Sequence, residues 1–457
     1  MKKRFYVFSM LAAGMLLAGC SDDLEGGQDG PNVVEGVTGY ARLALNLPTE
    51  GATTRAANDN FHDGLLEEYK VNDGIIAFFT GPTTGTDEDA TFVRAYSLNG
   101  LSNWTPVGST TDQITTKKVV ISEAPLPATG YRIYALVFLN PNGIVTSTNN
   151  GLSIGGTSLS AISKLSDVRT FLANQTVDKY TEKDDAASFF MSNAPLASNE
   201  KVGDKNTIKV QTLVPVHVYP TETEAEGANT SDQIYVERAV AKVTLSGFNH
   251  DDTNGYTIEV DDASNIYNDD VVKLEGWVLN KTNKSTAVVR NVTPASETWS
   301  TYTTPSQYAY FFGSTSANII GANQYRIYWA VDNNYDSDDT EDNAFNVYDA
   351  KTDDKNIGWN TDAETSTASH PLYCLENTMN TQKAMADDAN ITYVLLKTTY
   401  NFGAGDAGTS FFVVQNAPTK GTMTESDFVT YVNTQMNYSN GDAVSVSDAA
   451  KGGTYDT

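Results

Sequence analysis

The sequence predicts an all-β protein with two tandem β-sandwich domains and one short helix in the N-terminal domain. Threonine, valine, tyrosine and phenylalanine dominate the ordered stretches, and clusters of Gly, Asn and Asp separate them. Several stretches are apolar on both faces, such as YRIYALVFL at 131–139, which is typical of a strand inside a sandwich. Many such strands with turn signals between them favour stacked β-sandwiches.

The first strand is expected at residues 40–47, where apolar residues alternate with others. Helical spacing occurs only from Ser158 to Leu172, so the short helix is expected there. The remaining strands are expected at residues 74–80, 91–98, 117–122, 131–139, 208–219, 236–246, 271–279, 324–331, 391–400 and 410–414.

The segment 221–232, TETEAEGANTSD, is polar, acidic and without periodicity, and it lies between two strong strand patterns. We therefore place the domain boundary there, with an N-terminal domain at 38–232 and a C-terminal domain at 233–457. The chain of 457 residues is long enough for two or three domains, and its 40% hydrophobic content supports real cores.

The alternation at 40–47 predicts a strand with one buried face, formed by Ala41, Leu43, Leu45 and Leu47. A polar loop follows at residues 49–54 and ends at Arg55 and Ala56. An exposed arginine in such a loop is where an arginine-specific protease would cut. The alternative is an ordinary first strand followed by an incidental arginine.

Residues 1–20 read as a secretory signal peptide. Three cations at positions 2–4 precede a short apolar run that ends in Leu-Ala-Gly before Cys20, which is the pattern of a bacterial lipobox. Cys20 is therefore the expected lipidation site. Residues 21–37 form a flexible acidic tether, similar to the signal that sends some lipoproteins to the outer cell surface; a simple solvated linker is the alternative.

The remaining composition argues mainly against other functions. The formal charge of −27 repels nucleic-acid phosphates, so no nucleic-acid partner is expected. Of the two cysteines, Cys20 is assigned to lipid, so Cys374 has no disulfide partner in the mature chain and is expected to be a small buried hydrophobe.

No catalytic or cofactor pattern is present in the sequence. The four histidines are scattered, and there is no HExxH, no Gly-x-Ser-x-Gly elbow and no P-loop. Paired aspartates at 251–252, 261–262 and 269–270 lie among turn residues, which disfavours a sandwich hydrolase. The acidic loop 332–342 lacks EF-hand spacing and is expected to be solvated. We expect no enzyme activity, no cofactor and no metal.

Four stretches resemble the fimbrillin family, and specifically the major-subunit-like proteins of minor-fimbrium (type V, lipoprotein-derived) pili. The best match is VERAVAKV at 236–243, which looks like the interdomain strand of that family, with Val236, Glu237, Arg238 and Val240 as its residues. The others are GWVLN at 276–280 with TNK at 282–284 and VR at 289–290, YRIYWAVDNNY at 325–335, and YCLENT at 373–378 followed by TYVLLK at 392–397.

The resemblance implies sandwich domains of the transthyretin-like, Greek-key kind in a structural subunit of a cell-surface fimbrium that supports adhesion. The precursor would reach the outer membrane through a lipid such as palmitate on Cys20, and an arginine-specific protease would cut after Arg55. The first strand, with Tyr40, Leu43, Leu45 and Leu47, would then be displaced. Another pilus subunit would fill its groove by donor-strand exchange, giving a head-to-tail homo- or hetero-polymer.

Two alternatives stay open. The first alternative is a monomeric surface lipoprotein that binds glycans or host proteins. Processing at Arg55 and polymerisation of the product would distinguish a pilus subunit from such a protein. The C-terminal residues 444–457 are polar, and no segment after 428–432 has the pattern of a donor strand. Either the sequence is incomplete, or this subunit accepts a donor without giving one, at a fibre end or as an unpolymerised variant.

Overall fold

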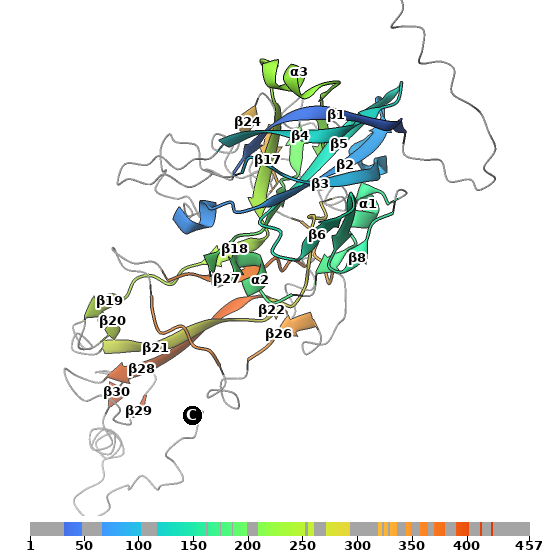
Figure 1. Ribbon diagram of the computed structural model, residues 1–457. Coiled ribbons are helices and arrows are strands. Elements are labelled where there is room, and N and C mark those ends of the chain that lie inside the picture. Colours follow the sequence, from blue (N-terminus) through green and yellow to red (C-terminus); the bar gives the residue numbers. More distant parts are fainter. Residues whose placement is uncertain are drawn as a thin grey trace, which may run out of the picture.

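The computed structural model describes residues 32–47, 66–101, 117–160, 163–173, 175–184, 186–198, 209–251, 255–259, 271–292, 319–321, 324–327, 330–335, 344–348, 357–363, 370–379, 390–401, 412–413 and 422–423. Within these residues the secondary structure is almost entirely β, and curled sheets enclose the cores (Figure 1). The predicted all-β sandwich class is confirmed. The division into two tandem domains stays a prediction.

The strands before residue 240 are β1 (Val33–Asn46), β2 (Gly74–Pro82), β3 (Thr91–Ser97), β4 (Lys117–Pro127), β5 (Tyr131–Leu139), β6 (Val145–Thr148), β7 (Gly151–Ile154), β8 (Thr157–Ser158), β9 (Leu172–Ala173), β10 (Glu182–Lys183), β11 (Ala186–Ala187), β12 (Met191–Asn193), β13 (Leu196–Ser198), β14 (Lys209–Gln211), β15 (Val214–Val216), β16 (Val218–Tyr219) and β17 (Asp232–Arg238).

The later strands are β18 (Val240–Val243), β19 (Asn249–Asp251), β20 (Gly255–Glu259), β21 (Val271–Asn280), β22 (Thr282–Asn283), β23 (Thr286–Ala287), β24 (Ile319–Gly321), β25 (Gln324–Arg326), β26 (Phe345–Asn346), β27 (Leu372–Leu375), β28 (Tyr393–Asn401), β29 (Phe412–Val413) and β30 (Thr422–Met423). The helical segments are η1 (Leu66–Tyr69), η2 (Asp87–Asp89), α1 (Leu165–Val168), α2 (Asp178–Thr181) and α3 (Glu222–Gly227).

The largest sheet has nine strands. Its main path runs β16-β1-β17-β12-β5-β2-β3, with β4 paired to β1 and β15 paired to β5. The strands β2 and β5 are buried on both faces, because successive side chains enter two different cores. In β2, Phe78 packs in the same core as the leucines of β1, whereas Phe79 packs in the opposite core. This explains why the sequence of 131–139 is apolar without alternation.

Pairings between the two halves cross the expected boundary at residue 232. The strand β17 lies inside the nine-stranded sheet, so that sheet extends to Arg238. Further along, β23 pairs with β9 and β25 pairs with β13. Val288 and Val289 also pack in the core that contains Phe79. Segments of the second half therefore complete the packing of the first.

The helix expectation needs correction. Among the described residues of 158–172, only Leu165–Val168 are helical, because Ser158 pairs with Ser153 of β7 and Leu172 pairs with Ala287. These pairings satisfy the backbone at both ends of the segment and override its helical spacing. The expected linker 221–232 instead contains α3, which starts with a capping box between Thr221 and Glu224. Among the described residues before 232 there are thus three short α-helices instead of one.

A second, four-stranded sheet, β19-β20-β21-β28, lies in the lower part of Figure 1. Its core gathers Tyr256, Leu274, Trp277, Leu279 and Ala363, together with Cys374 from β27. The indole Nε1 of Trp277 donates a hydrogen bond of 2.8 Å to the carbonyl of Asp362, and the side chain is fully buried. No helix among the residues described above has the length and apolar character to cross a membrane.

We expect Trp277→Ala to lower the free energy of unfolding by ~3–5 kcal/mol, because it leaves a large cavity in this core and an unpaired carbonyl at Asp362. The measurement is urea denaturation followed by circular dichroism. Trp277→Phe is the control: it keeps most of the ring volume and loses only the hydrogen bond, so its loss should be clearly smaller. An unchanged midpoint for Trp277→Ala would contradict the burial.

Candidate functional site

The first strand, β1, lies between other strands on both of its sides (Figure 1). On one side it pairs antiparallel with β4, from Thr38 opposite Pro125 to Asn46 opposite Lys117. On the other side it pairs first with β16, antiparallel, and then with β17, parallel. Removing β1 would therefore leave a gap one strand wide, with unpaired backbone groups on both walls.

The buried positions of β1 lie between residues 39 and 45, and Leu47, just after the strand, is buried too. Leu43 and Leu45 are fully buried and Leu47 is 2% exposed, and all three pack against apolar side chains of β2, β5 and β17. Tyr40 is half-buried, with Tyr219 and Glu123 as its neighbours across the two ladders. Ala44, whose side chain leaves the strand on the opposite face, is buried as well, so the residues from 43 to 45 are enclosed on both faces.

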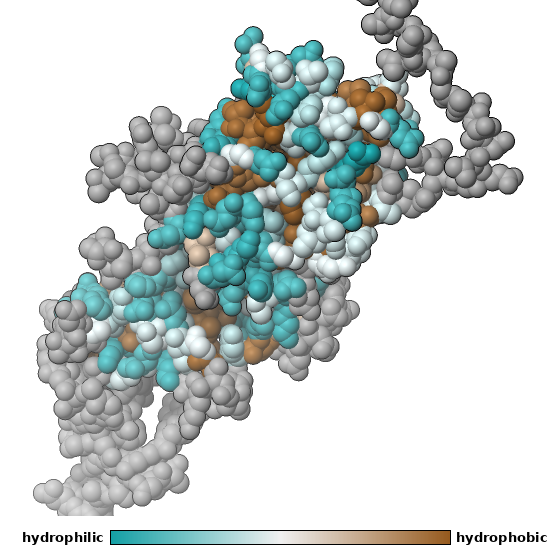
Figure 2. Space-filling model, viewed as in Figure 1, coloured by the Kyte–Doolittle hydropathy of each residue, from teal (hydrophilic) through white to brown (hydrophobic). Residues whose placement is uncertain are grey.

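The earlier part of β1 is open to solvent. Figure 2 shows apolar surface over the upper part of the molecule, where Figure 1 places β1 and β4. The exposed apolar side chains of these two strands are Val34, Val37 and Val119. Only the second half of the strand is thus held as core.

Two features fit β1 tightly into its place. Gly39 is a glycine for steric reasons, since a Cβ there would lie 2.4 Å from Cγ1 of Val218 and 2.9 Å from the carbonyl oxygen of Tyr219. Arg42 reaches the other neighbour, α3: its Nη1 donates to the carbonyl of Glu226 at 3.1 Å, and its Nε donates to Ser231 Oγ at 3.1 Å. The strand is therefore fixed by close packing at Gly39 and by the hydrogen bonds of a cation at Arg42.

The predicted lipidation and processing residues, Cys20, Arg55 and Ala56, lie outside the described residues, as does the C-terminal segment 444–457. The segment 48–65 that contains Arg55 connects Leu47, the end of the buried part of β1, to η1.

The expected interdomain strand extends from the large sheet toward the second half of the chain. Val236 is buried in β17, whereas Val240 pairs with Leu375 of β27. Between them the strand breaks at Ala239, whose N–H donates to the carbonyl of Phe190. Residues 232–243 therefore link β1 to β27.

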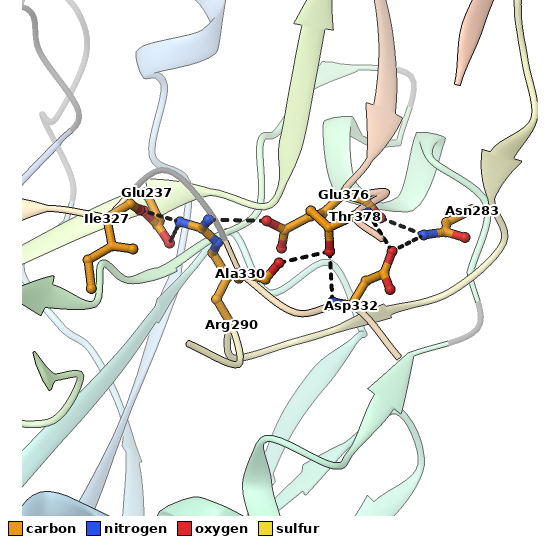
Figure 3. A network of polar contacts seen from close by, with 8 residues as sticks. All are labelled: Glu237, Asn283, Arg290, Ile327, Ala330, Asp332, Glu376 and Thr378. Carbon is orange, nitrogen blue, oxygen red and sulfur yellow. Dashed lines mark hydrogen bonds and ion pairs between the residues drawn. The ribbon is translucent and has the colours of Figure 1, made fainter. Parts of the chain in front are cut away.

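An ion cluster lies on one side of this link (Figure 3). Arg290 donates from Nη1 to Glu237 Oε1 at 2.9 Å and from Nη2 to Glu376 Oε1 at 3.1 Å. Its side chain is only 16% exposed. Burial alone would lower the pKa of Arg290, but the two carboxylates more than reverse this, so its pKa stands above the ordinary value and the guanidinium stays charged.

A second cluster lies on the other side, around the buried Glu68 of η1. The Tyr373 hydroxyl donates to Glu68 Oε1 at 2.6 Å, and Lys242 Nζ lies 3.0 Å from the same oxygen. Arg238 donates twice to the backbone carbonyl of Glu68. Burial, followed by the contact with Glu68, raises the pKa of Tyr373, so this tyrosine remains a neutral donor. The segment that follows 48–65 is thus anchored at the link.

A third set of contacts joins residues 330–332 to 376–378 (Figure 3). Oδ2 of Asp332 accepts from the N–H of Thr378 at 2.7 Å and from Nδ2 of Asn283 at 2.9 Å. The Thr378 hydroxyl donates to the carbonyl of Ala330. Asp332 is 6% exposed, and burial raises its pKa to about 6 despite these donors, with Glu376 adding to the rise.

The expectation of a solvated loop at 332–342 therefore fails at its first residue, Asp332, while 336–342 lie outside the described residues. Where side chains can be placed, no group of three or more His, Cys, Asp or Glu is arranged to hold a metal ion. Cys374 is buried, as expected, and burial raises the pKa of its thiol to about 11.

Sequence reasoning missed Arg42, Glu68, Arg290 and Glu376 as partners. For Arg42 the sequence contained part of the answer: Thr221-x-x-Glu224 has the pattern of a capping box, which predicts the helix α3 that Arg42 contacts. The other three have no local signal, because their partners lie far away in sequence.

We expect Asp332→Asn to remove a pH-dependent part of the stability. Because the pKa of Asp332 in the folded state, about 6, exceeds its ordinary 3.8, the folded protein holds a proton that the unfolded chain releases. This stabilisation is present below pH ~4 and is lost as the pH rises through about 6. The unfolding free energy of the wild type should fall by up to about 3 kcal/mol relative to the variant across this range.

The measurement is urea denaturation at a series of pH values for both proteins. Asp89→Asn is the control, since it makes the same change at a carboxylate that is 68% exposed. Parallel pH profiles for the wild type and Asp332→Asn would contradict the raised pKa.

No protein-family model matches the sequence, and no curated protein matches it. Three solved structures from Parabacteroides distasonis are similar at low level. One is provisionally assigned to cell adhesion, with 12% identity and a TM-score of 0.29, covering 55% of this chain and 57% of that one, so this chain spans just over half of its length. A fimbrial assembly protein has 12% identity and a TM-score of 0.30, covering 82% and 90%. Another provisional cell adhesion protein has 14% identity and a TM-score of 0.30, covering 85% and 90%.

Proposed function

We propose that this chain is a structural subunit of a cell-surface fimbrium, exported as a lipoprotein precursor, cut after Arg55 and assembled by donor-strand exchange. One observation carries the proposal: β1, the first strand among the described residues, lies between β4 and the β16–β17 edge, with Leu43, Leu45 and the following Leu47 in the core. The sequence resemblance to fimbrillins supports it.

The position of β1 suits a removable strand. In the part of the chain that the structure describes it is the first strand and it precedes residues 48–65, so a single cut there frees it from everything that follows. Its three leucines contribute roughly 1.5–3 kcal/mol each as an upper estimate, and its backbone hydrogen bonds add to that. The uncut precursor should therefore be stable, with its own strand at high effective concentration in the gap.

After cleavage the balance changes. The strand is no longer tethered, and a strand from another molecule can compete for the gap. An incoming strand restores the backbone partners of β4 and β17 and covers the apolar core. If the donor belongs to a further copy or a related subunit, the contact is head-to-tail and does not close, which produces a filament.

The lipid on Cys20 would direct the precursor to the outer membrane. We expect Cys20→Ala to abolish incorporation of labelled fatty acid and delivery to the outer membrane, because the thiol is the acceptor of the lipid. The measurement is metabolic labelling followed by membrane fractionation, with Ser21→Ala as the control that keeps the lipobox cysteine. Normal surface delivery of the mutant, with no label in the wild type, would refute the lipoprotein assignment.

Assembly into fibres would require cleavage after Arg55. We expect Arg55→Ala to leave an intact precursor that fills its own gap and yields no fibres, whereas Thr54→Ala, next to it, should be cut and polymerise normally. N-terminal mass spectrometry of surface material and electron microscopy of fibres are the measurements. Fibres of uncut Arg55→Ala subunits at wild-type yield would rule out strand exchange.

A further inference from the structure

We propose that the gap occupied by β1 selects the strand that fills it, by a cation site that α3 and Ser231 form over the middle of the strand. This inference rests on the proposed function and adds the chemistry of the partner. Below, the seat means the walls of the gap, β4, β16 and β17, together with α3.

The cation site is occupied in this structure by Arg42 of β1. Its Nη1 donates to the carbonyls of Glu226 at 3.1 Å and of Ala225 at 3.5 Å, and its Nε donates to Ser231 Oγ at 3.1 Å. These partners lie more than 180 residues further along the chain. The guanidinium thus connects the removable strand to a part of the molecule that stays behind when the strand leaves.

The chemistry of α3 favours a cation at this point. Its sequence, ETEAEG, has three carboxylates, and the carbonyls at its C-terminal end carry a partial negative charge. The capping box fixes the start of the helix, and α3 contacts β16 and β4 as well as β1, so part of its packing stays behind when the strand leaves. A strand without a cation would take the guanidinium donor away from the Glu226 carbonyl and from Ser231 Oγ, whereas Ala225 would keep the N–H of Ala228; a strand with a carboxylate there would be repelled.

The shape of the seat adds further conditions. At the level of Gly39, Val218 and the carbonyl of Tyr219 leave no room for a Cβ. On the core face, Leu43, Leu45 and Leu47 fill buried positions, while Ala44 on the opposite face is also fully enclosed. The seat therefore fits an extended strand with three features. It has a glycine at the position of Gly39, an Arg or Lys at the position of Arg42, and then apolar residues that alternate with a small residue at the position of Ala44.

The partner we infer is a strand of another protein molecule with that pattern. Apolar alternation alone would admit many strands; the added cation and glycine restrict the choice.

Peptide exchange tests the selection directly. The full chain is nicked with an arginine-specific protease and incubated with fluorescent peptides of residues 38–47. The wild-type peptide should be taken up, and the Arg42→Glu peptide should bind at least about tenfold more weakly, since a hydrogen-bonded charge is replaced by repulsion. Arg42→Lys should lie between the two, and Gly39→Val should also bind weakly. Thr38→Glu is the matched control, because it adds a carboxylate at an exposed position of β1.

A second measurement separates this inference from the proposed function. In the uncut full chain, Arg42→Glu should lower the melting temperature more than Arg94→Glu, the same substitution on β3 at the far edge of the sheet. Uptake of all peptides with equal affinity would overturn the selection and leave strand exchange standing. If no peptide is taken up, the proposed function fails, and equal melting temperatures for the two full-chain variants would then overturn the cation site as well.

Discussion

The backbone pairing of β1 on both sides is the constraint on which the rest of the large sheet depends. Without this strand, the backbone groups of β4 that pair with Thr38–Asn46 lose their partners. The edges of β16 and β17 that face β1 are then open as well. The core that holds Phe78 would also lose the leucines that close it. A segment at the start of the described chain thus completes a sheet whose other strands extend to residue 238. Its place in the sheet can be taken only by another extended strand.

The link from β17 to β18 gives the molecule its second constraint. Glu237 and Arg238 are neighbours on an extended strand, so their side chains leave on opposite faces and enter different ion clusters. Each cluster draws a distant segment to the link: residues 290 and 376 on one face, and Glu68 of η1 on the other. Because buried charges are costly without their partners, these contacts favour one arrangement of the strands around Ala239.

Much of the fold could be predicted from local pattern. The alternation at 40–47 indicates the buried leucines, and the apolar run at 131–139 coincides with β5, because burial on one or both faces leaves a direct trace in the sequence. The helix predicted from the spacing at 158–172 was too long. Strand pairing with Ser153 and with Ala287 determines the backbone conformation at the two ends of that segment. The linker reading of 221–232 missed a capping box that was present in the sequence.

The polar contacts of the candidate site could not be predicted in the same way. Arg42 and Ser231 are separated by 189 positions, and Glu68 and Tyr373 by 305. A charged residue in the sequence carries no information about which distant carbonyl or carboxylate it will meet. Residue type can indicate that Arg290 needs acidic partners if it is buried, but only the fold identifies them as Glu237 and Glu376.

The pairing of β1 with strands on both sides also has a mechanical consequence. A force along the axis of such a strand acts in shear, so the hydrogen bonds to β4 and to β17 are strained together and must break nearly at once. A strand pulled away sideways from a free edge would open one bond at a time, at much lower force. A connection made through this gap would consequently be strongest in the direction of the strand itself.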